Sequence, residues 1–290
     1  MWFWLALASA VLGAIEVILS KWALNKVSPA LLSWSLFALT LPILIPLALL
    51  QGFPSFNVLF ITGIIGSSLF FVFARTLFNG ALRDSLVSQI LPLTAFSGFF
   101  TYIFGLIILA ETIRPIPVAG LFTVIIGSYV LNVDQVKENI FEPFKLLFKT
   151  RGALLLLLAI LLGSITAIFD KIGVKNTFPE NPTFVIFAEQ LIQSVLMTGY
   201  LLKTEKKTWI PSLKQNFYLL FIISILFLAI SFLILYAYKD GSVALILGVK
   251  RLQIFFILIL GYIFLKDKPT KQSWFATAIM ILGVLMIKSG

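Results

Sequence analysis

The sequence contains no histidine and no cysteine, and only 12% of its 290 residues are charged. Without these two residue types there can be no thiolate site, disulfide framework, imidazole base or zinc finger. A soluble domain usually carries about 25% charged residues, so this composition cannot cover a globular surface. Together with 60% apolar residues and a mean hydropathy of +1.06, it indicates an integral membrane protein.

The sequence also lacks the motifs of several function classes. No nucleophile–base pair, carboxylate pair, clustered Asp/Asn loop or glycine-rich phosphate loop stands out, so we predict neither an enzyme nor a metal site nor any cofactor. The formal net charge is +10, which would favour nucleic acid as the partner of a soluble protein. Here the basic residues lie between apolar runs, where lipid phosphate and membrane topology explain them, so no nucleic-acid partner is predicted.

Apolar runs long enough to cross a bilayer as helices recur along the whole chain. We predict an all-α integral membrane fold with ten transmembrane helices, near residues 2–20, 29–50, 57–79, 85–109, 113–132, 152–172, 183–202, 216–238, 242–265 and 270–288. The polar stretch 134–151 places apolar side chains at helical spacing between lysines, which predicts a short amphipathic helix in the membrane interface.

Two pairs of segments indicate an internal repeat. Residues 12–21 (LGAIEVILSK) align with 162–171 (LGSITAIFDK), and residues 99–109 (FFTYIFGLIIL) align with 255–265 (FFILILGYIFL). The predicted organisation is a first five-helix repeat at 1–133, the linker 134–151 and a second five-helix repeat at 152–290. Because each repeat has an odd number of spans, the second enters the membrane in the opposite sense, as in secondary transporters with a central substrate site.

The second half of each repeat resembles the drug/metabolite transporter superfamily in its ten-helix EamA-like form. The first copy contains Ala81-Leu82, ILPLTAFSGFF with Pro92, Glu111 and VAGLFTVIIGSYVL, and the second reads VALILGVKRLQIFFILILGYIFLKDKPT. Gly248 replaces the helix-breaking proline of the family, and Asp267 stands where glutamate is usual. The resemblance implies a ten-helix fold and export or exchange of small metabolites. It also implies coupling or gating roles for Glu111, Asp267, Pro92 and Gly248, although for the two acids the favoured explanation is an interfacial carboxylate that anchors the next helix.

The run Val249-Lys250-Arg251 is similar to the sugar-phosphate and nucleotide-sugar branches of the superfamily, although the fourth span has no lysine of the kind those branches use. Lys250 and Arg251 fall near mid-bilayer, where each charge costs about 2.5–3.5 kcal/mol on insertion scales. A structural ion pair is the alternative to substrate binding. Because adjacent helix residues point about 100° apart, one partner cannot easily neutralise both, and we predict that they bind a substrate carboxylate or phosphate.

Glu16 lies within the first span, and two interpretations remain open for it. It is either a proton-coupling carboxylate or counter-ion of the two cations, contributing to substrate binding, or a member of a static salt bridge. Further polar side chains within spans are predicted to complete a substrate cavity: Gln89, Glu189, Gln193, Trp34, Asn79 and Tyr236.

The predicted function is secondary active transport of small metabolites by alternating access, with or without proton coupling, in the plasma membrane as a multi-pass protein. A non-transporting scaffold or lipid scramblase is the alternative. Membrane lipid is the expected environment, and either a monomer or a homodimer is compatible with the sequence. Most of the 22 basic residues lie in loops after odd-numbered spans, which predicts both termini outside the cell, whereas family precedent places them inside.

Overall fold

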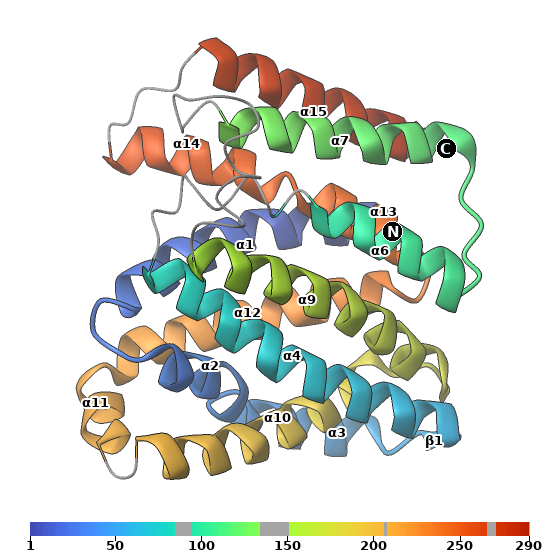
Figure 1. Ribbon diagram of the computed structural model, residues 1–290. Coiled ribbons are helices and arrows are strands. Elements are labelled where there is room, and N and C mark those ends of the chain that lie inside the picture. The colour runs from blue at the N-terminus through green and yellow to red at the C-terminus, as the bar shows by residue number, and fades with distance from the viewer. Residues whose placement is uncertain (85–93, 95, 134–150, 206–207, 266–270, 290) are drawn as a thin grey trace.

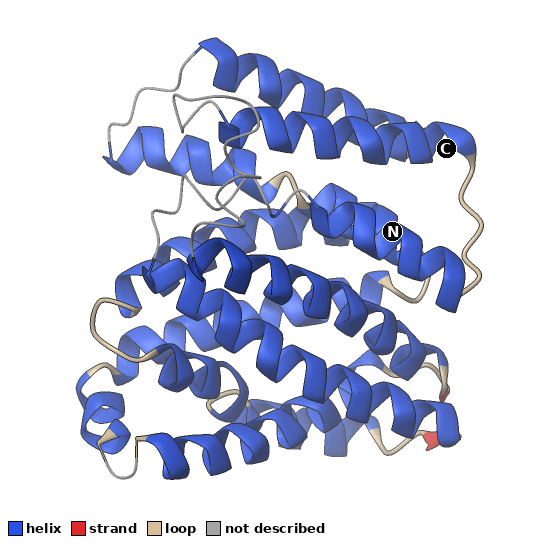
Figure 2. Cartoon of the chain, in the orientation of Figure 1, coloured by secondary structure: helices blue, strands red, loops and turns tan. Residues whose placement is uncertain are grey.

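The computed structural model describes residues 1–84, 94, 96–133, 151–205, 208–265 and 271–289. Its elements are helices apart from one pair of two-residue strands, with loops and turns between them (Figure 2). The elements are α1 (Trp2–Ala23), α2 (Pro29–Ala38), α3 (Leu41–Gln51), β1 (Ser55–Phe56), α4 (Val58–Asp84), α6 (Phe96–Ile108), α7 (Pro115–Val133), α9 (Arg151–Lys175), β2 (Thr177–Phe178), α10 (Pro182–Thr204), α11 (Trp209–Gln215), α12 (Phe217–Ala237), α13 (Val243–Lys250), α14 (Gln253–Leu265) and α15 (Lys271–Ser289). The predicted interfacial helix at 134–151 falls almost entirely outside the described residues.

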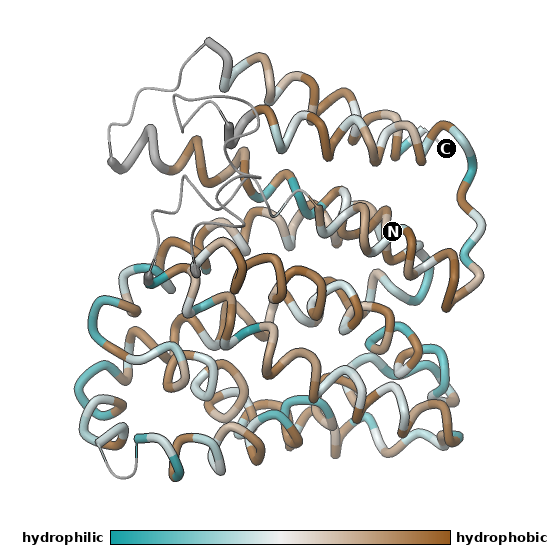
Figure 3. The backbone as a smooth tube through the Cα atoms, in the orientation of Figure 1, coloured by the Kyte–Doolittle hydropathy of each residue, from teal (hydrophilic) through white to brown (hydrophobic). Residues whose placement is uncertain are grey.

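Seven helical segments among the described residues are long and apolar enough to cross a membrane, and three shorter apolar helices accompany them. The long segments correspond to α1, α2 with α3, α4, α9, α10, α12 and α13 with the start of α14, whereas α6, α7 and α15 contain the shorter ones. Apolar residues dominate the helices, and most polar segments lie at the helix ends (Figure 3). The chain is therefore a multi-pass helical membrane protein.

Local sequence sets where the second helix of each half begins. Ser28 caps α2 by accepting a hydrogen bond from the N–H of Leu31 at 3.0 Å, and Pro29 follows. Asn181 caps α10 in the same way through the N–H of Phe184 at 3.0 Å, and Pro182 follows. Proline suits the first helical position because its missing N–H would have no intrahelical partner there.

The two halves pack against each other through corresponding helices. The first helix of each half packs on the third helix of the other, as α1 on α12 and α9 on α4. The second helices pack on each other, as do the fifth helices, which form the pairs α2 with α10 and α7 with α15. Figure 1 shows α7 and α15 running antiparallel side by side, with both chain ends at the same edge.

The α7–α15 contact depends on small residues at matched positions. A Cβ on Gly120 would lie 2.6 Å from the carbonyl oxygen of Gly283, and a Cβ on Gly127 would lie 3.0 Å from that of Ala276. At such distances only hydrogen fits, so these glycines allow the two backbones to approach. The pairs Gly120/Ala276 and Gly127/Gly283 share the sequence offset of the second repeat block, so each contact has a counterpart in the other half.

Candidate substrate-binding site

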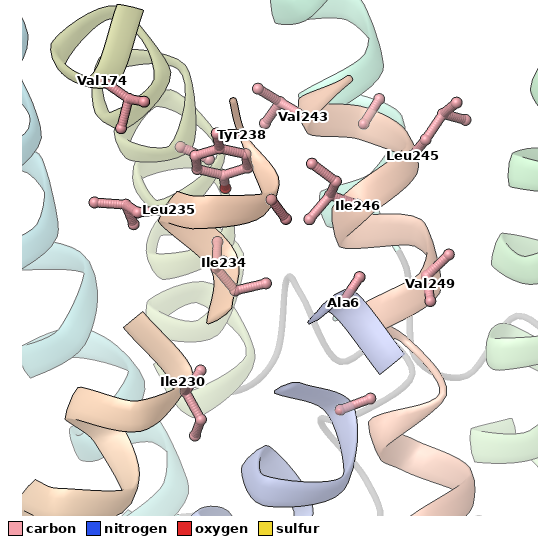
Figure 4. Close-up of a cluster of buried hydrophobic side chains, with 14 of the residues drawn as sticks. Ala6, Val174, Ile230, Ile234, Leu235, Tyr238, Val243, Leu245, Ile246 and Val249 are labelled. Carbon is pink, nitrogen blue, oxygen red and sulfur yellow. The ribbon is translucent and has the colours of Figure 1, made fainter. Parts of the chain in front are cut away.

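A cavity of about 330 Å³ lies inside the bundle, between helices of both halves. Helices α1, α4, α6, α9, α10, α12, α13 and α14 contribute to its walls. One wall is apolar: Ile230, Ile234, Leu235 and Tyr238 at the end of α12 line the cavity and belong to a buried cluster that includes Val243 and Ile246 of α13 (Figure 4). The charged side chains on the other walls are Glu16, Arg75, Asp170, Glu189, Lys250 and Arg251.

Lys250 and Arg251 line the cavity at a break in the ninth predicted span. Helix α13 ends at Lys250, and α14 begins at Gln253. The N–H of Arg251 is still held by the carbonyls of Leu247 and Gly248, at 3.2 and 3.1 Å. Within the described part of the chain, neither cationic side chain forms a hydrogen bond or an ion pair, although Lys250 lies within electrostatic range of Glu16 and Asp170.

Glu16 instead forms a salt bridge with Arg75 of α4. The side chains of Glu16 and Arg75 are only 5% and 13% exposed, and the hydroxyl of Ser20 donates to the same carboxylate at 2.9 Å. The guanidinium of Arg75 also lies over the rings of Phe78 and Phe227, at 5.8 and 5.6 Å from their centroids. Of the two interpretations of Glu16, this geometry favours the structural ion pair.

Two more carboxylates face the cavity beside this pair. Asp170 of α9 and Glu189 of α10 lie within hydrogen-bonding distance of each other, and the hydroxyl of Ser67 in α4 donates to Asp170. Glu189 is 6% exposed, and its Oε1 atom has no hydrogen-bond partner among the described residues. Gln193, one turn further along α10, is 3% exposed, and its side chain forms no hydrogen bond within the same part of the chain.

Three predicted cavity residues lie outside the lining of this cavity. Trp34 donates to the hydroxyl of Thr198 at 2.8 Å and packs on Trp209. The amide of Asn79 donates to the hydroxyl of Ser33 at 2.9 Å, and the hydroxyl of Tyr236 lies 3.0 Å from that of Thr183. All three therefore join neighbouring helices. Gln89, Pro92 and Asp267 lie outside the described residues, and their placement stays a prediction.

Glu111 holds the start of α13 from the end of the α6 segment. After α6 ends, Ala110 adopts a left-handed conformation with φ of 49°, and the N–H of Glu111 donates to the carbonyl of Gly105 at 3.1 Å. The Glu111 carboxylate accepts from the hydroxyl of Ser242 at 2.6 Å, from the N–H of Val243 at 3.2 Å and from the ammonium of Lys171. This arrangement stabilises the N-terminus of α13, where negative charge is favoured.

Gly248 lies inside α13, two residues before the end of that helix. A Cβ at this position would lie 2.7 Å from Cδ1 of Leu121 in α7. The glycine therefore allows close packing between α13 and α7, and the helical hydrogen bonds are interrupted only after Lys250.

The fold and the charge-lined cavity define a multi-pass membrane protein with an internal polar site, and comparison with known proteins makes the class more specific. The sequence profile of the EamA-like transporter family matches residues 1–133 and 150–289. The chain therefore belongs to the EamA-like transporter family, whose members are membrane transporters of small molecules, consistent with the drug/metabolite transporter superfamily.

A solved structure, described only as "Crystal structure of protein", shares the fold. It superposes with a TM-score of 0.72 at 14% sequence identity, covering 98% of this chain and 94% of that one. No curated protein matches the chain.

Sequence reasoning left a static salt bridge of Glu16 open but did not identify Arg75 as its partner, and it did not identify the Asp170–Glu189 pair. The Glu16–Arg75 bridge joins residues 59 positions apart, and the signal for it is one buried charge of each sign in two different spans. Asp170 and Glu189 do not belong to one sequence motif. Asp170 is followed by Lys171, and two adjacent charged residues suggest a helix end at the membrane interface. Only the crossing of α4, α9 and α10 brings these groups together.

Proposed function

We propose that the protein is a secondary transporter of small metabolites that carry a carboxylate or phosphate group, with Lys250 and Arg251 as the anion-binding residues. The observation that carries the proposal is that both cations line a cavity of about 330 Å³ and lack an ion-pair partner in the described part of the chain. Burying charges without partners is costly. A substrate anion would supply the missing partner.

We also propose that ten helices cross the membrane as two inverted five-helix repeats, in the plasma membrane. The packing of corresponding helices between the halves supports this, because under a two-fold relation every contact between two residues recurs between their counterparts in the other half. The antiparallel α7–α15 pair with its two matched glycine contacts is the sharpest example. In such a fold, rocking of one half against the other exposes the central cavity alternately to the two sides.

The two cations have different chemical roles in this proposal. Lysine presents a compact charge, whereas arginine presents a planar fork that can make two parallel hydrogen bonds to a carboxylate or phosphate. A hydrogen bond to a charged group contributes about 1.5–3 kcal/mol. Loss of either cationic side chain should therefore weaken binding of the substrate anion by roughly 10- to 150-fold.

Counterflow in proteoliposomes tests the proposal. Purified protein is reconstituted, loaded with unlabelled metabolites from a carboxylate and phosphate panel, and assayed for uptake of the labelled compound. We expect saturable uptake that falls in Lys250→Met and Arg251→Gln, with partial recovery in Arg251→Lys. Lys175→Met is the matched control, because Lys175 is 41% exposed and pairs with Glu180 away from the cavity.

Two results would contradict the proposal. Uptake that is unchanged in both cavity variants would remove Lys250 and Arg251 from the substrate site. Absence of counterflow for every anion in the panel, with folded protein in the vesicles, would favour the scaffold or scramblase alternative instead.

A further inference from the structure

We infer that Asp170 and Glu189 share a single proton and form the coupling site of this transporter, so that a proton accompanies the transported anion. The coupling half of this inference rests on the proposed function. The proton-sharing half rests only on the geometry of the two acids.

The first step concerns the number of protons that the pair holds. The two carboxylates lie within hydrogen-bonding distance of each other on α9 and α10, inside the part of the bundle that crosses the membrane. Two ionised carboxylates at that separation repel strongly in a medium of low polarity. One shared proton removes the repulsion and supplies a hydrogen bond between them, as in other carboxylate dyads.

The second step concerns donors around the pair. Ser67 supplies one hydroxyl to Asp170, but Oε1 of Glu189 is buried without a hydrogen-bond partner among the described residues. A fully ionised glutamate in this position would leave an acceptor unsatisfied, which is unfavourable inside a membrane. Gln193 is likewise buried and lines the same cavity, and its side-chain amide forms no hydrogen bond with the described residues. These unfilled polar positions mark the face of α10 that points into the cavity.

The third step concerns the charged and titratable groups facing the pair from neighbouring helices. Lys250 of α13 and Tyr238 after α12 both lie within electrostatic range of Asp170, and Tyr238 also of Glu189. Glu111 is within electrostatic range of Tyr238. Within the described ranges, none of these groups forms a hydrogen bond or ion pair with either acid, so none replaces the proton as the partner of the second carboxylate.

The remaining charges of the cavity divide into two kinds. Glu16 and Arg75 neutralise each other through their salt bridge, whereas Arg251 carries no partner among the described residues. The carboxylate of Glu16 is therefore already paired with a permanent positive charge, the guanidinium of Arg75. The dyad of Asp170 and Glu189 is the better site for a group that must gain and lose a proton.

The last step gives the direction of coupling. When the dyad holds a proton, one negative charge near Lys250 is removed, and the cavity has a net positive charge that an anion can neutralise. When the dyad loses the proton, that negative charge returns and disfavours the anion. Proton binding and anion binding therefore favour each other, and linkage makes the effect equal in both directions. The predicted reaction is symport of one proton with the anion.

Infrared titration of the protein in lipid nanodiscs tests the shared proton without any substrate. A protonated carboxyl group gives a C=O stretching band that shifts in deuterated water. We expect the wild type to keep such a band at neutral pH, and Asp170→Asn and Glu189→Gln to lose it. Glu16→Gln and the exposed control Glu180→Gln should keep the band. Asp170→Glu preserves both acids and should also keep it, and this variant replaces Asp170→Asn if that protein is not recovered in folded form.

The infrared result overturns the inference if the wild type shows no such band at neutral pH, or if Glu16→Gln removes the band and the dyad variants retain it. Titration with sodium chloride in place of choline chloride adds a further test. A band that disappears only in sodium would assign the site to a metal cation and contradict the shared proton.

Coupling is tested separately in wild-type vesicles that contain a pH-sensitive dye. The probe is the panel anion that shows counterflow, and its entry should acidify the vesicle interior. Net entry of the anion into vesicles that initially contain none of it, without acidification of the vesicle interior, would overturn the coupling. Absence of counterflow overturns the proposed function, whereas the infrared result still decides whether the acids share a proton.

Discussion

The Glu16–Arg75 salt bridge makes a prediction about which of its two residues can be removed at lower cost. Both side chains are nearly inaccessible, at 5% and 13% exposure, so neither charge can be rehydrated when its partner is removed. Breaking a buried ion pair from one side costs about 3–5 kcal/mol, because the remaining charge stays buried. The two single variants, however, leave different groups behind.

Glu16→Gln leaves the guanidinium of Arg75, which cannot lose its proton and remains a charge without a counter-ion. We expect the full loss of about 3–5 kcal/mol in the free energy of unfolding. Arg75→Met leaves the carboxylate of Glu16, which keeps one hydrogen-bond donor, the hydroxyl of Ser20, to offset part of its charge. Its cost should be smaller, mainly the two cation–π contacts with Phe78 and Phe227, at about 0.5–2 kcal/mol each.

The double variant gives the decisive comparison, because it removes both charges together. Replacing a buried pair by neutral groups of similar volume is often close to neutral. Arg75→Met should therefore restore stability when it is added to Glu16→Gln. The assay is equilibrium unfolding by SDS in mixed micelles, followed by tryptophan fluorescence, and the exposed pair variant Lys175→Met should change the free energy by about 1 kcal/mol or less. Strictly additive single costs would refute the buried pair.

The remaining predictions concern packing and one residue outside the cavity. Gly120→Ala should sharply reduce the yield of folded protein in detergent, because its Cβ would meet the backbone of Gly283, whereas Gly199→Ala, which has open space around it, should leave the yield unchanged. Trp34→Phe removes the hydrogen bond to Thr198 and should lower the melting temperature in detergent without changing the half-saturation constant of counterflow. A changed half-saturation constant would place Trp34 at the substrate.

The long helices could be predicted from sequence because the bilayer constrains them so strongly. Backbone polar groups have no partner in hydrocarbon, so an uninterrupted apolar run must be a helix. The expected spans at 2–20, 152–172 and 183–202 correspond to α1, α9 and α10, with ends that differ by a few residues. The differences arise at helix ends, where capping residues such as Asn181 and polar side chains extend the helix beyond its apolar core.

The short elements could not be predicted by the same reasoning. Helix α11 and the β1–β2 pair lie in connections between spans, and their positions depend on contacts between segments distant in sequence. The break after Lys250 is a further example. Gly248 stands where the family has a helix-breaking proline, and a Cβ there would meet Leu121 of α7, whereas the helical hydrogen bonds are interrupted beyond Lys250. A gating role for Gly248 stays a prediction.

Hydropathy could identify polar residues within the spans but could not show which of them meet. Lys250, Arg251, Glu16, Glu189 and Gln193 all line one cavity, whereas Trp34, Asn79 and Tyr236 bond to neighbouring helices. All eight carry polar groups within apolar segments, so composition alone does not separate them. The separation depends on helix rotation and crossing, which are set by small-residue contacts such as those between α4 and α9.

The balance of charge in the cavity connects the two proposals. Six charged side chains of the described residues line it, three acids and three bases, and one acid and one base are joined in the Glu16–Arg75 bridge. With both remaining acids ionised, they offset Lys250 and Arg251, and the cavity offers no net attraction to an anion. One proton on the dyad leaves a single positive charge in excess, so the cavity attracts one negative charge only when it also holds a proton. Selectivity for an anion and coupling to a proton are then consequences of the same count.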